Sequence, residues 1–286
     1  MKNNIIQPNL NLGGGLNPTI SIVIPTYKTG SYLEPCLQSI QEQSFQTNEL
    51  EVLIILNGPK EPYWDSIREI IQKINLNIYL IYTESKGVCS ARNIGLDLAK
   101  GQFVAFVDDD DILSSNYFEE LHSKTTKDIL ACSDCIDFED TIDNSTIGYL
   151  GRVFRNSRNS SLIENRRLFS TAWGKVLPVE IIKGTRFNET IRFGEDALFM
   201  VELSPRITQI NLDNKAIYYR RLRSTSSTRI RVAFMVEFKN LLKIIRIYFG
   251  LIFRNLFNGM AWFIFLRFLA ALKYSFARFF NMDFRN

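Results

Sequence analysis

Four consecutive aspartates at positions 108–111 follow the apolar run of residues 103–107 and could bind a cation. Carboxylates packed side by side repel one another, so an arrangement that keeps them charged favours a divalent metal with hard oxygen ligands. The period of a strand predicts that Asp108 and Asp110 face one cation, with Asp109 turned away. Ligands of open α/β sheets bind just beyond the carboxyl ends of strands, which favours this interpretation over a solvated acidic turn that caps the next helix.

Three other charged residues could take part in chemistry, and each has a structural alternative. Arg92 falls in the first two turns of a helix predicted for residues 86–96, where backbone N–H groups favour anions, although a solvated surface arginine fits the same pattern. Glu195 and Asp196 follow a glycine at the start of an apolar helix, so they either cap that helix or face a cleft.

The composition excludes histidine chemistry and a disulfide framework. His122 is the only histidine, which rules out a histidine-based triad and a zinc site built on several histidines. The four cysteines are scattered, and the close pair Cys132 and Cys135 lacks a second pair with which to complete a zinc site. We therefore expect buried thiols in a reducing compartment.

Apolar runs and helical spacings alternate regularly along the first half of the chain. The pattern predicts strands at residues 20–24, 51–56, 78–82, 103–107 and 128–133, and helices at residues 33–43, 64–74, 86–96 and 116–124. Pro25 is expected to end the first strand because it cannot donate to a ladder. Strands that alternate with helices predict an α/β fold with a parallel sheet. Residues 134–165 are irregular and polar, which is typical of loops that shape a second substrate's site.

Several segments, taken in order, resemble the inverting glycosyltransferases of the GT-A fold, in the large bacterial family 2. The segments lie at residues 21–27, 91–95, 107–111, 173–175, 194–196 and 218–226. Residues 107–111 resemble the DxD-type metal motif, and residues 173–175 and 194–196 resemble segments on the acceptor side. Each segment is weak alone, but their order makes the resemblance specific. The implied fold is Rossmann-like, with a mostly parallel sheet and flanking helices.

The resemblance implies a nucleotide-diphosphate sugar as donor and Mg²⁺ or Mn²⁺ as cofactor. The side chains that it implies near the donor are Pro25, Thr26, Tyr27, Asn57, Arg92, Asp108 and Asp109. The implied metal ligands are Asp108 and Asp110, with Asp111 in support. Family members usually carry an Asp-Asp-Gly-Ser-like turn where residues 56–59 of this chain are Leu-Asn-Gly-Pro, so the identity of the nucleotide stays open.

On the acceptor side, the resemblance implies that Asp196 accepts the proton of the attacking hydroxyl, with Glu195 as the fallback base. Trp173, Lys175 and Arg223 are implied near the acceptor. The expected acceptor is a lipid-linked or growing surface glycan, as in capsule or O-antigen synthesis.

Two alternatives stay open at this point. A catalytically impaired protein that binds a nucleotide sugar or a glycan is compatible with the unusual Asn57. A sugar-1-phosphate nucleotidyltransferase would need a Gly-rich, basic loop for a triphosphate, and residues 25–28, Pro-Thr-Tyr-Lys, are not one.

The segments divide the chain into a loose leader at residues 1–18, a GT-A glycosyltransferase domain at residues 19–231, and a basic, aromatic-rich helical tail at residues 232–286. Within the domain, residues 19–135 are expected to bind the nucleotide sugar and residues 136–231 the acceptor.

Charge is distributed unevenly along the chain. Residues 220–286 hold 13 Lys and Arg against 2 Asp and Glu, whereas the residues before them hold 21 against 28. The longest uncharged segment of the tail, residues 255–266, is shorter than the ~20 apolar residues of a spanning helix. We therefore expect the tail to lie in the interface of an anionic membrane, with packing on the domain, a partner protein or a homo-oligomer contact as alternatives. Without a signal-peptide core at the N-terminus, the enzyme is expected to be peripheral on the cytoplasmic face of the inner or plasma membrane, with no nucleic-acid partner.

Overall fold

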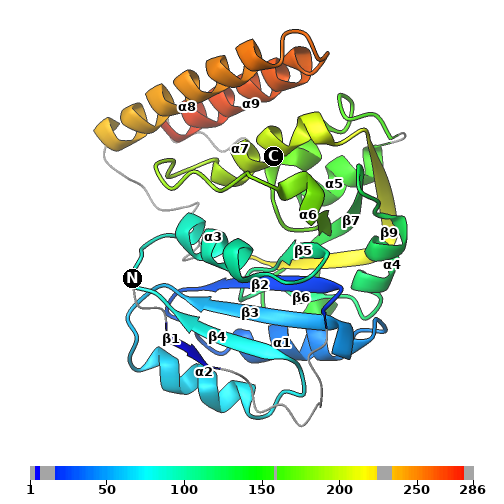
Figure 1. Cartoon of the computed structure of the whole chain (residues 1–286), viewed down its shortest axis with the longest axis vertical. Coiled ribbons are helices and arrows are strands. Elements are labelled where there is room, and N and C mark those ends of the chain that lie inside the picture. The colour runs from blue at the N-terminus through cyan, green and yellow to red at the C-terminus, as the bar shows by residue number, and fades with distance from the viewer. Residues whose placement is uncertain (1–3, 7–16, 158–159, 224–233, 280–286) are drawn as a thin grey trace.

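The computed structural model describes residues 4–6, 17–157, 160–223 and 234–279 of the chain (Figure 1). Its main sheet has six strands in the order β1-β4-β3-β2-β5-β8. The strands are β1 Asn4–Ile6, β2 Ile20–Thr26, β3 Leu50–Leu56, β4 Ile78–Tyr82, β5 Phe103–Phe106 and β8 Leu177–Pro178. β2, β3, β4 and β5 run parallel, while β1 and β8 are antiparallel at the two edges. The fold is therefore α/β with a mixed sheet whose centre is parallel, as predicted.

Helices cover both faces of this sheet, which explains why every residue of β2 and β3 is buried. On one face, Ile22 and Ile24 share a core with α1 Leu33–Gln41 and α2 Tyr63–Ile71. On the other face, α3 Val88–Leu98 approaches β2 so closely that a Cβ on Gly95 would lie 2.3 Å from Cγ1 of Val23. A glycine is therefore required at this point of α3.

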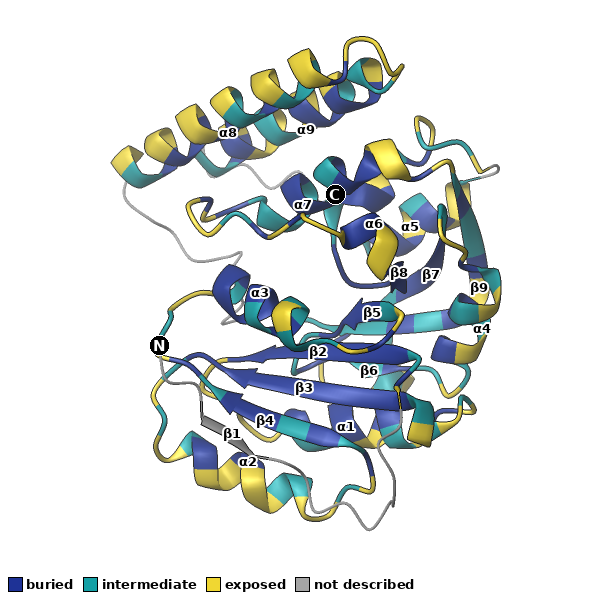
Figure 2. Cartoon of the chain, viewed as in Figure 1, coloured by how far each residue is buried: buried dark blue, intermediate teal, exposed yellow. Residues whose placement is uncertain are grey.

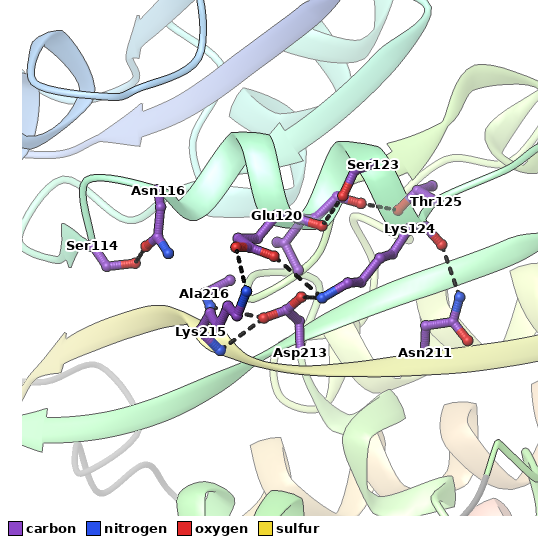
Figure 3. A network of polar contacts seen from close by, with 11 residues as sticks. Ser114, Asn116, Glu120, Ser123, Lys124, Thr125, Asn211, Asp213, Lys215 and Ala216 are labelled. Atoms are coloured by element: carbon purple, nitrogen blue, oxygen red, sulfur yellow. Dashed lines mark hydrogen bonds and ion pairs between the residues drawn. The ribbon is translucent and has the colours of Figure 1, made fainter.

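A second sheet of three strands, in the order β6-β9-β7, joins the two halves of the domain. Its strands are β6 Ile112–Leu113, β7 Ile129–Phe138 and the long β9 Gln209–Arg221. The sheet is backed by α4 Tyr117–Lys124, and Figure 3 shows the polar network between them. Lys124 donates to the buried Asp213 of β9, and Asn211 Nδ2 donates to the Lys124 carbonyl at 2.9 Å. This network anchors α4 to β9 directly after the acidic segment, and it is structural.

The remaining elements lie mainly in the second half of the chain. They are η1 Thr47–Glu49, η2 Ile142–Asn144, α5 Tyr149–Asn156, η3 Arg166–Ser170, α6 Val179–Ile182, α7 Glu195–Leu203, η4 Ser204–Arg206, α8 Phe234–Arg254 and α9 Ala261–Phe279. α8 and α9 form a helical hairpin at one end of the molecule, which we call the tail hairpin (Figure 1). Its inner face belongs to the domain core, since Phe263 contacts Phe169 of η3 with ring centroids 5.1 Å apart. Figure 2 shows that its outer face is exposed.

Several sequence-based expectations need correction. Pro25 does not end the first strand, because β2 continues to pair with β3 through Thr26. The N–H that proline lacks would point to the other neighbour, β5, whose pairing with β2 has already ended at Val23, so no ladder hydrogen bond is lost. The leader is not entirely loose, since β1 pairs with β4, and the rest of residues 1–16 lie outside the described residues. Residues 134–165 are less irregular than expected, because β7 extends to Phe138 and α5 follows it.

Candidate active site

The four aspartates lie on a turn at the carboxyl end of β5, and not on the strand itself. β5 ends at Phe106, and the Asp111 N–H donates to the Asp108 carbonyl at 3.2 Å, which closes the turn. The expectation that alternation along a strand orients Asp108 and Asp110 to one side is therefore wrong. The position at the end of a parallel strand is as predicted.

Residues of β9 determine the shape of this acidic turn. The Tyr218 hydroxyl accepts the Asp108 N–H at 3.1 Å, and Oδ1 of Asp111 accepts the Arg221 N–H at 2.7 Å. Arg221 Nε also donates to the Asp110 carbonyl at 3.0 Å. The turn is thus held by a strand that lies about a hundred residues later in the chain.

The carboxylates of the turn are crowded and largely buried. Burial, reinforced by Asp110, raises the pKa of Asp109 to about 7, and burial together with Asp108 raises that of Asp110 to about 6. Burial also raises the pKa of Asp111, which is 2% exposed, well above its ordinary value. Asp110 forms an ion pair with Arg223, which lowers its pKa in part.

This crowding suits a divalent cation, whose charge would relieve the repulsion between carboxylates. Asp108 and Asp110 are the side chains that fit as ligands, because neither carboxylate accepts a hydrogen bond from β9, as that of Asp111 does. Arg92 pairs with Asp108, and Arg223 pairs with Asp110. The sequence predicts Asp111 in support of the metal, whereas its carboxylate is used by the Arg221 N–H and the Tyr218 hydroxyl. Within the described ranges, no three acidic, histidine or cysteine side chains converge as a ready-made metal site.

Arg92 is buried between two of the predicted site residues. Its side chain, on α3, donates through Nη2 to Asp108 Oδ1 at 3.1 Å and through Nη1 to Asp196 Oδ1. The rings of Phe106 and Phe187 flank the guanidinium, with centroids 6.0 and 5.3 Å away. Although burial opposes the charge, Asp196 and Asp108 raise the pKa of Arg92 above its ordinary value. The alternative of a solvated surface arginine is therefore wrong, since Arg92 is 3% exposed.

Asp196 lies in the first turn of α7 and faces Arg92. Gly194 precedes the helix with a left-handed backbone, φ 85°, and no side chain caps this helix end. Asp196 Oδ2 accepts the Ala172 N–H at 3.3 Å, while Oδ1 accepts from Arg92. The interpretation of these carboxylates as helix caps is therefore wrong, and Asp196 instead contacts Arg92 and the Ala172 N–H.

The environment of the two acidic residues on α7 suits proton transfer. Burial raises the pKa of Asp196 against the opposing charge of Arg92. Burial and then Asp196 raise the pKa of Glu195 to about 7. A carboxylate whose pKa is raised towards neutrality is a better proton acceptor than an ordinary surface carboxylate. Arg92 orients the carboxylate of Asp196.

Four of the residues predicted near the donor, Pro25, Thr26, Tyr27 and Asn57, lie at the carboxyl ends of β2 and β3. Pro25 and Thr26 are buried, whereas Tyr27 is 60% exposed and its ring covers Gly58, where a Cβ would lie 2.8 Å from the ring. Asn57 is 5% exposed, and its Nδ2 donates to the Gly87 carbonyl at 2.8 Å. Asn57 thus ties the end of β3 to the start of α3, a role that the sequence did not reveal.

The three residues predicted near the acceptor do not form one site. Lys175 is 3% exposed and donates to the carbonyls of Thr171, at 3.0 Å, and Trp173, at 3.1 Å, so it holds this loop together. Trp173 is also buried and stacks on Tyr218, with ring centroids 4.6 Å apart. Arg223 pairs with Asp110 at the acidic turn. Burial of their side chains excludes direct acceptor contact by Lys175 and by most of Trp173 in this conformation.

Asn93 is a site residue that was missed as an individual side chain. Its Oδ1 accepts the Phe187 N–H at 2.8 Å, and its Nδ2 donates to the Phe187 carbonyl and to Glu189 Oε1, both at 3.0 Å. It therefore joins α3 to the segment that leads to α7. Its place beside Arg92 in residues 91–95 was the only sequence feature that could have pointed to it.

Comparison with known proteins points to one family. The sequence profile described as Glycosyl transferase family 2 matches residues 21–180. The chain is 27% identical over 224 residues to Glycosyltransferase GlyA of Streptococcus pneumoniae, covering 74% of this chain and 32% of GlyA. It is also 27% identical over 208 residues to the poly(ribitol-phosphate) beta-N-acetylglucosaminyltransferase TarS of Staphylococcus aureus, covering 70% of this chain and 35% of TarS. The chain thus spans about a third of the length of either relative.

Solved structures share the fold. S. aureus TarS 1–349 in complex with UDP-GlcNAc superposes with a TM-score of 0.62 at 20% identity, covering 79% of this chain and 66% of that one. The mannosyltransferase PcManGT from Pyrobaculum calidifontis, in complex with GDP-Man and Mn²⁺, superposes with a TM-score of 0.58 at 14% identity, covering 92% of this chain and 74% of that one. The expected α/β, GT-A-like fold with flanking helices is confirmed, while the membrane association expected of the tail stays a prediction.

Proposed function

Because the chain belongs to glycosyltransferase family 2, we propose that it is an inverting, metal-dependent hexosyltransferase that uses a nucleotide-diphosphate sugar. The sugar is transferred to a hydroxyl of a lipid-linked or growing cell-surface glycan. The observation that carries this proposal is the buried Arg92, which contacts Asp108 of the acidic turn with one nitrogen and Asp196 of α7 with the other. One guanidinium therefore contacts both the donor-side residue Asp108 and the acceptor-side residue Asp196.

Asp196 is the proton acceptor in this proposal. Its carboxylate is held by Arg92 and by the Ala172 N–H, which fixes its orientation, and burial keeps its pKa raised. A base held in this way takes the proton of the acceptor hydroxyl as that oxygen attacks the anomeric carbon from the face opposite the leaving group. Glu195, with a pKa of about 7, is the fallback base.

The acidic turn provides the donor side of the site. Asp108 and Asp110 would hold Mg²⁺ or Mn²⁺, and Asp109 would lie beside the donor. The cation, when bound, would neutralise the charge that develops on the departing diphosphate. The Mn²⁺ in the PcManGT complex supports a metal-binding site in this fold.

The nucleotide and the acceptor are proposed by similarity. TarS was solved with UDP-GlcNAc and acts on poly(ribitol-phosphate), as its name says, which supports a UDP-sugar and a cell-surface polymer here. Tyr27 is placed to lie near the base, since it is 60% exposed beyond the end of β2. Thr26 and Asn57 are buried at the ends of β2 and β3, and Gly58 lies against the Tyr27 ring.

The tail hairpin supports a peripheral membrane location, on the cytoplasmic face of the inner or plasma membrane. Large apolar side chains exposed on it are Phe234, Met235, Phe238, Leu242, Phe249, Phe253, Leu256, Phe257, Trp262, Phe265, Leu269, Tyr274 and Phe276. Exposed basic side chains among them are Lys239, Arg246, Arg254 and Lys273. Neither α8 nor α9, nor any other described helix, is long and apolar enough to span a bilayer. An apolar face mixed with basic residues favours adsorption to anionic lipid, each basic residue contributing about 1 kcal/mol before screening.

Other functions are weighed by the same test. A binding protein that has lost catalysis would keep donor affinity without turnover, and a nucleotidyltransferase would consume a sugar-1-phosphate. A homo-oligomer contact through the tail hairpin is the alternative to membrane binding.

The decisive experiment is a panel of UDP-, GDP- and dTDP-sugars with Mn²⁺ or Mg²⁺, in which nucleotide diphosphate release is measured with and without acceptor glycan. Metal-dependent release of nucleotide diphosphate supports the proposal, and its absence with every donor overturns it.

A further inference from the structure

The segment of residues 187–193 presents Asp196, and two asparagines from distant helices hold its ends. Asn93 of α3 exchanges two hydrogen bonds with the backbone of Phe187, at 2.8 and 3.0 Å. Asn240 of α8 accepts the Arg192 N–H at 2.8 Å and donates to the Phe193 carbonyl at 3.3 Å. Only one residue, Gly194, then separates Phe193 from the start of α7. We call residues 187–193 the base-presenting segment.

Asn240 is one of a stripe of polar residues that α8 turns towards this segment. Glu237, Asn240 and Lys243 recur every three residues, which places them on one face of the helix. Lys243 Nζ donates to the Thr190 carbonyl at 3.0 Å. Glu237 is 6% exposed and pairs with Arg278 of α9 at 2.7 Å. The guanidinium of Arg278 lies 3.5 Å from the ring centroid of Phe193.

This contact is more specific than the packing of an apolar tail requires. A buried side-chain amide that pairs with one N–H and one carbonyl of a loop restrains the loop at two points, because losing the amide would leave both backbone groups buried and unpaired. Asn240 is 5% exposed, and Phe193 is 8% exposed, so water does not readily replace these bonds. The tail hairpin therefore contributes to the position of the residues that precede Asp196.

We propose that Asn240 is a positioning residue for Asp196, so that the tail hairpin is part of the active-site framework and not only an attachment to a surface. Asn240 touches neither the acidic turn nor Asp196, and it lies outside residues 21–180, which match the family profile. It acts through Arg192 and Phe193 on the start of α7. The role of Asp196 in this inference rests on the proposed function, whereas the mechanical coupling does not.

The test compares Asn240→Ala with Asn255→Ala in the full chain. Asn255 is a matched control because it directly follows α8, is 8% exposed and, among the described residues, forms its side-chain bonds inside the hairpin, through Nδ2 to the Leu251 carbonyl at 2.8 Å and with Asn258. Hydrogen–deuterium exchange by mass spectrometry follows peptides over residues 170–176 and 188–199. The Ala172 N–H is informative, because Asp196 is its acceptor.

We expect Asn240→Ala to speed exchange in both peptides by about 10-fold, while Asn255→Ala leaves both unchanged. With the donor that the panel identifies, kcat falls about 10- to 100-fold and the donor KM stays within about 3-fold, as expected for a misplaced base. The exposed Lys243→Ala, which removes only the Thr190 bond and does not endanger folding, is expected to speed exchange in residues 188–199 alone.

Unchanged exchange at Ala172 in Asn240→Ala would overturn the coupling. Equal losses of kcat in Asn240→Ala and Asn255→Ala, or losses that follow the melting temperature, would reduce Asn240 to a structural residue. If the wild-type chain releases no nucleotide from any donor, the proposed function fails, but the exchange result still decides the coupling. If Asn240→Ala does not fold, Lys243→Ala decides instead, and unchanged hydrogen exchange in residues 188–199 of that variant overturns the proposal.

Discussion

Arg92 donates to the carboxylate of Asp196 across 104 positions of sequence. The same guanidinium reaches Asp108 of the acidic turn at 3.1 Å, so one buried cation holds the two halves of the candidate site together. Because Arg presents several donors in a planar fork, it can serve two carboxylates at once, which an ammonium on a flexible stem does less well.

Arg92→Lys is therefore expected to keep the positive charge and lose the bridge. We expect kcat/KM to fall by roughly 10²-fold, because the base and the acidic turn are no longer held in register. The control is Arg186→Lys, which alters an ion pair with Asp97 whose side chains are 45% and 60% exposed and should leave kcat/KM unchanged. Equal activity of the two variants would show that the bridge is not required.

Asp196→Asn is expected to retain donor affinity within a few-fold and to lower transfer by ~10²–10⁴-fold, because the base acts on the acceptor hydroxyl. Asn has a single oxygen, so in this geometry it can accept from Arg92 or from the Ala172 N–H but not from both, and thermal melting therefore checks that the fold is preserved. Donor affinity is measured by calorimetry and transfer by nucleotide release. Near-full transfer by this variant would move the role to Glu195 or to neither residue.

The double substitution Asp108→Asn with Asp110→Asn is expected to abolish metal-dependent donor binding without unfolding the protein. Burial, together with Asp108, raises the pKa of Asp110, and burial, together with Asp110 and Asp108, raises that of Asp111, so removing two charges relieves repulsion in the metal-free state. Calorimetry with Mn²⁺ and the donor tests binding, and thermal melting without metal tests the fold. Asp140→Asn with Asp143→Asn, at two exposed positions outside the site, is the charge-matched control. Donor affinity that still depends on Mn²⁺ in the site variant would refute the metal assignment.

The raised pKa of Glu195 predicts that the stability of the folded protein depends on pH. Burial, followed by Asp196, raises its pKa from 4.5 to about 7 in the folded protein, so the folded state prefers the protonated form. Ionising Glu195 thus costs stability, and this loss develops as pH rises from 4.5 to about 7. In urea denaturation at pH 8, the free energy of unfolding of Glu195→Gln should therefore exceed that of the wild type by on the order of 1 kcal/mol. This difference in free energy should be smaller at pH 5 and should vanish only below the pKa of Glu195 in the unfolded chain. A gap of the same size at both pH values would contradict the assignment.

The membrane proposal is best tested on the outer face of the tail hairpin. Ending the chain near Arg231 is not a clean test, because Ile244, Tyr248 and Phe263 of the hairpin belong to the domain core. The triple substitution of Phe253, Phe257 and Trp262 by Ser removes side chains that are 75%, 100% and 57% exposed. We expect it to abolish the co-sedimentation of the wild-type protein with anionic vesicles, which should itself weaken as salt is raised.

Ile147→Ser, at an apolar position 46% exposed and outside the hairpin, is the control and should leave vesicle binding intact. A wild-type protein that ignores anionic vesicles at low salt would end the membrane proposal. Loss of a dimer in the triple variant, seen by light scattering, would identify the face as a contact between copies.

Much of this molecule was determined by local sequence pattern. The alternating strands and helices up to residue 133 follow from hydrophobic spacing, because an element that packs on one side records its period in the chain itself. The order of short motifs led to family 2, and the acidic residues after β5 lay where a parallel sheet presents ligands.

Tertiary structure alone decided how these residues are used. Asp108 to Asp111 are identical side chains in the sequence, yet Arg92, Arg223 and the Arg221 N–H distinguish them, and these partners come from distant elements. Only the tertiary structure shows, likewise, that Lys175 is buried. The hairpin contact through Asn240 follows this rule too, because a hydrogen bond across distant elements requires the whole fold and leaves no periodic trace in the chain.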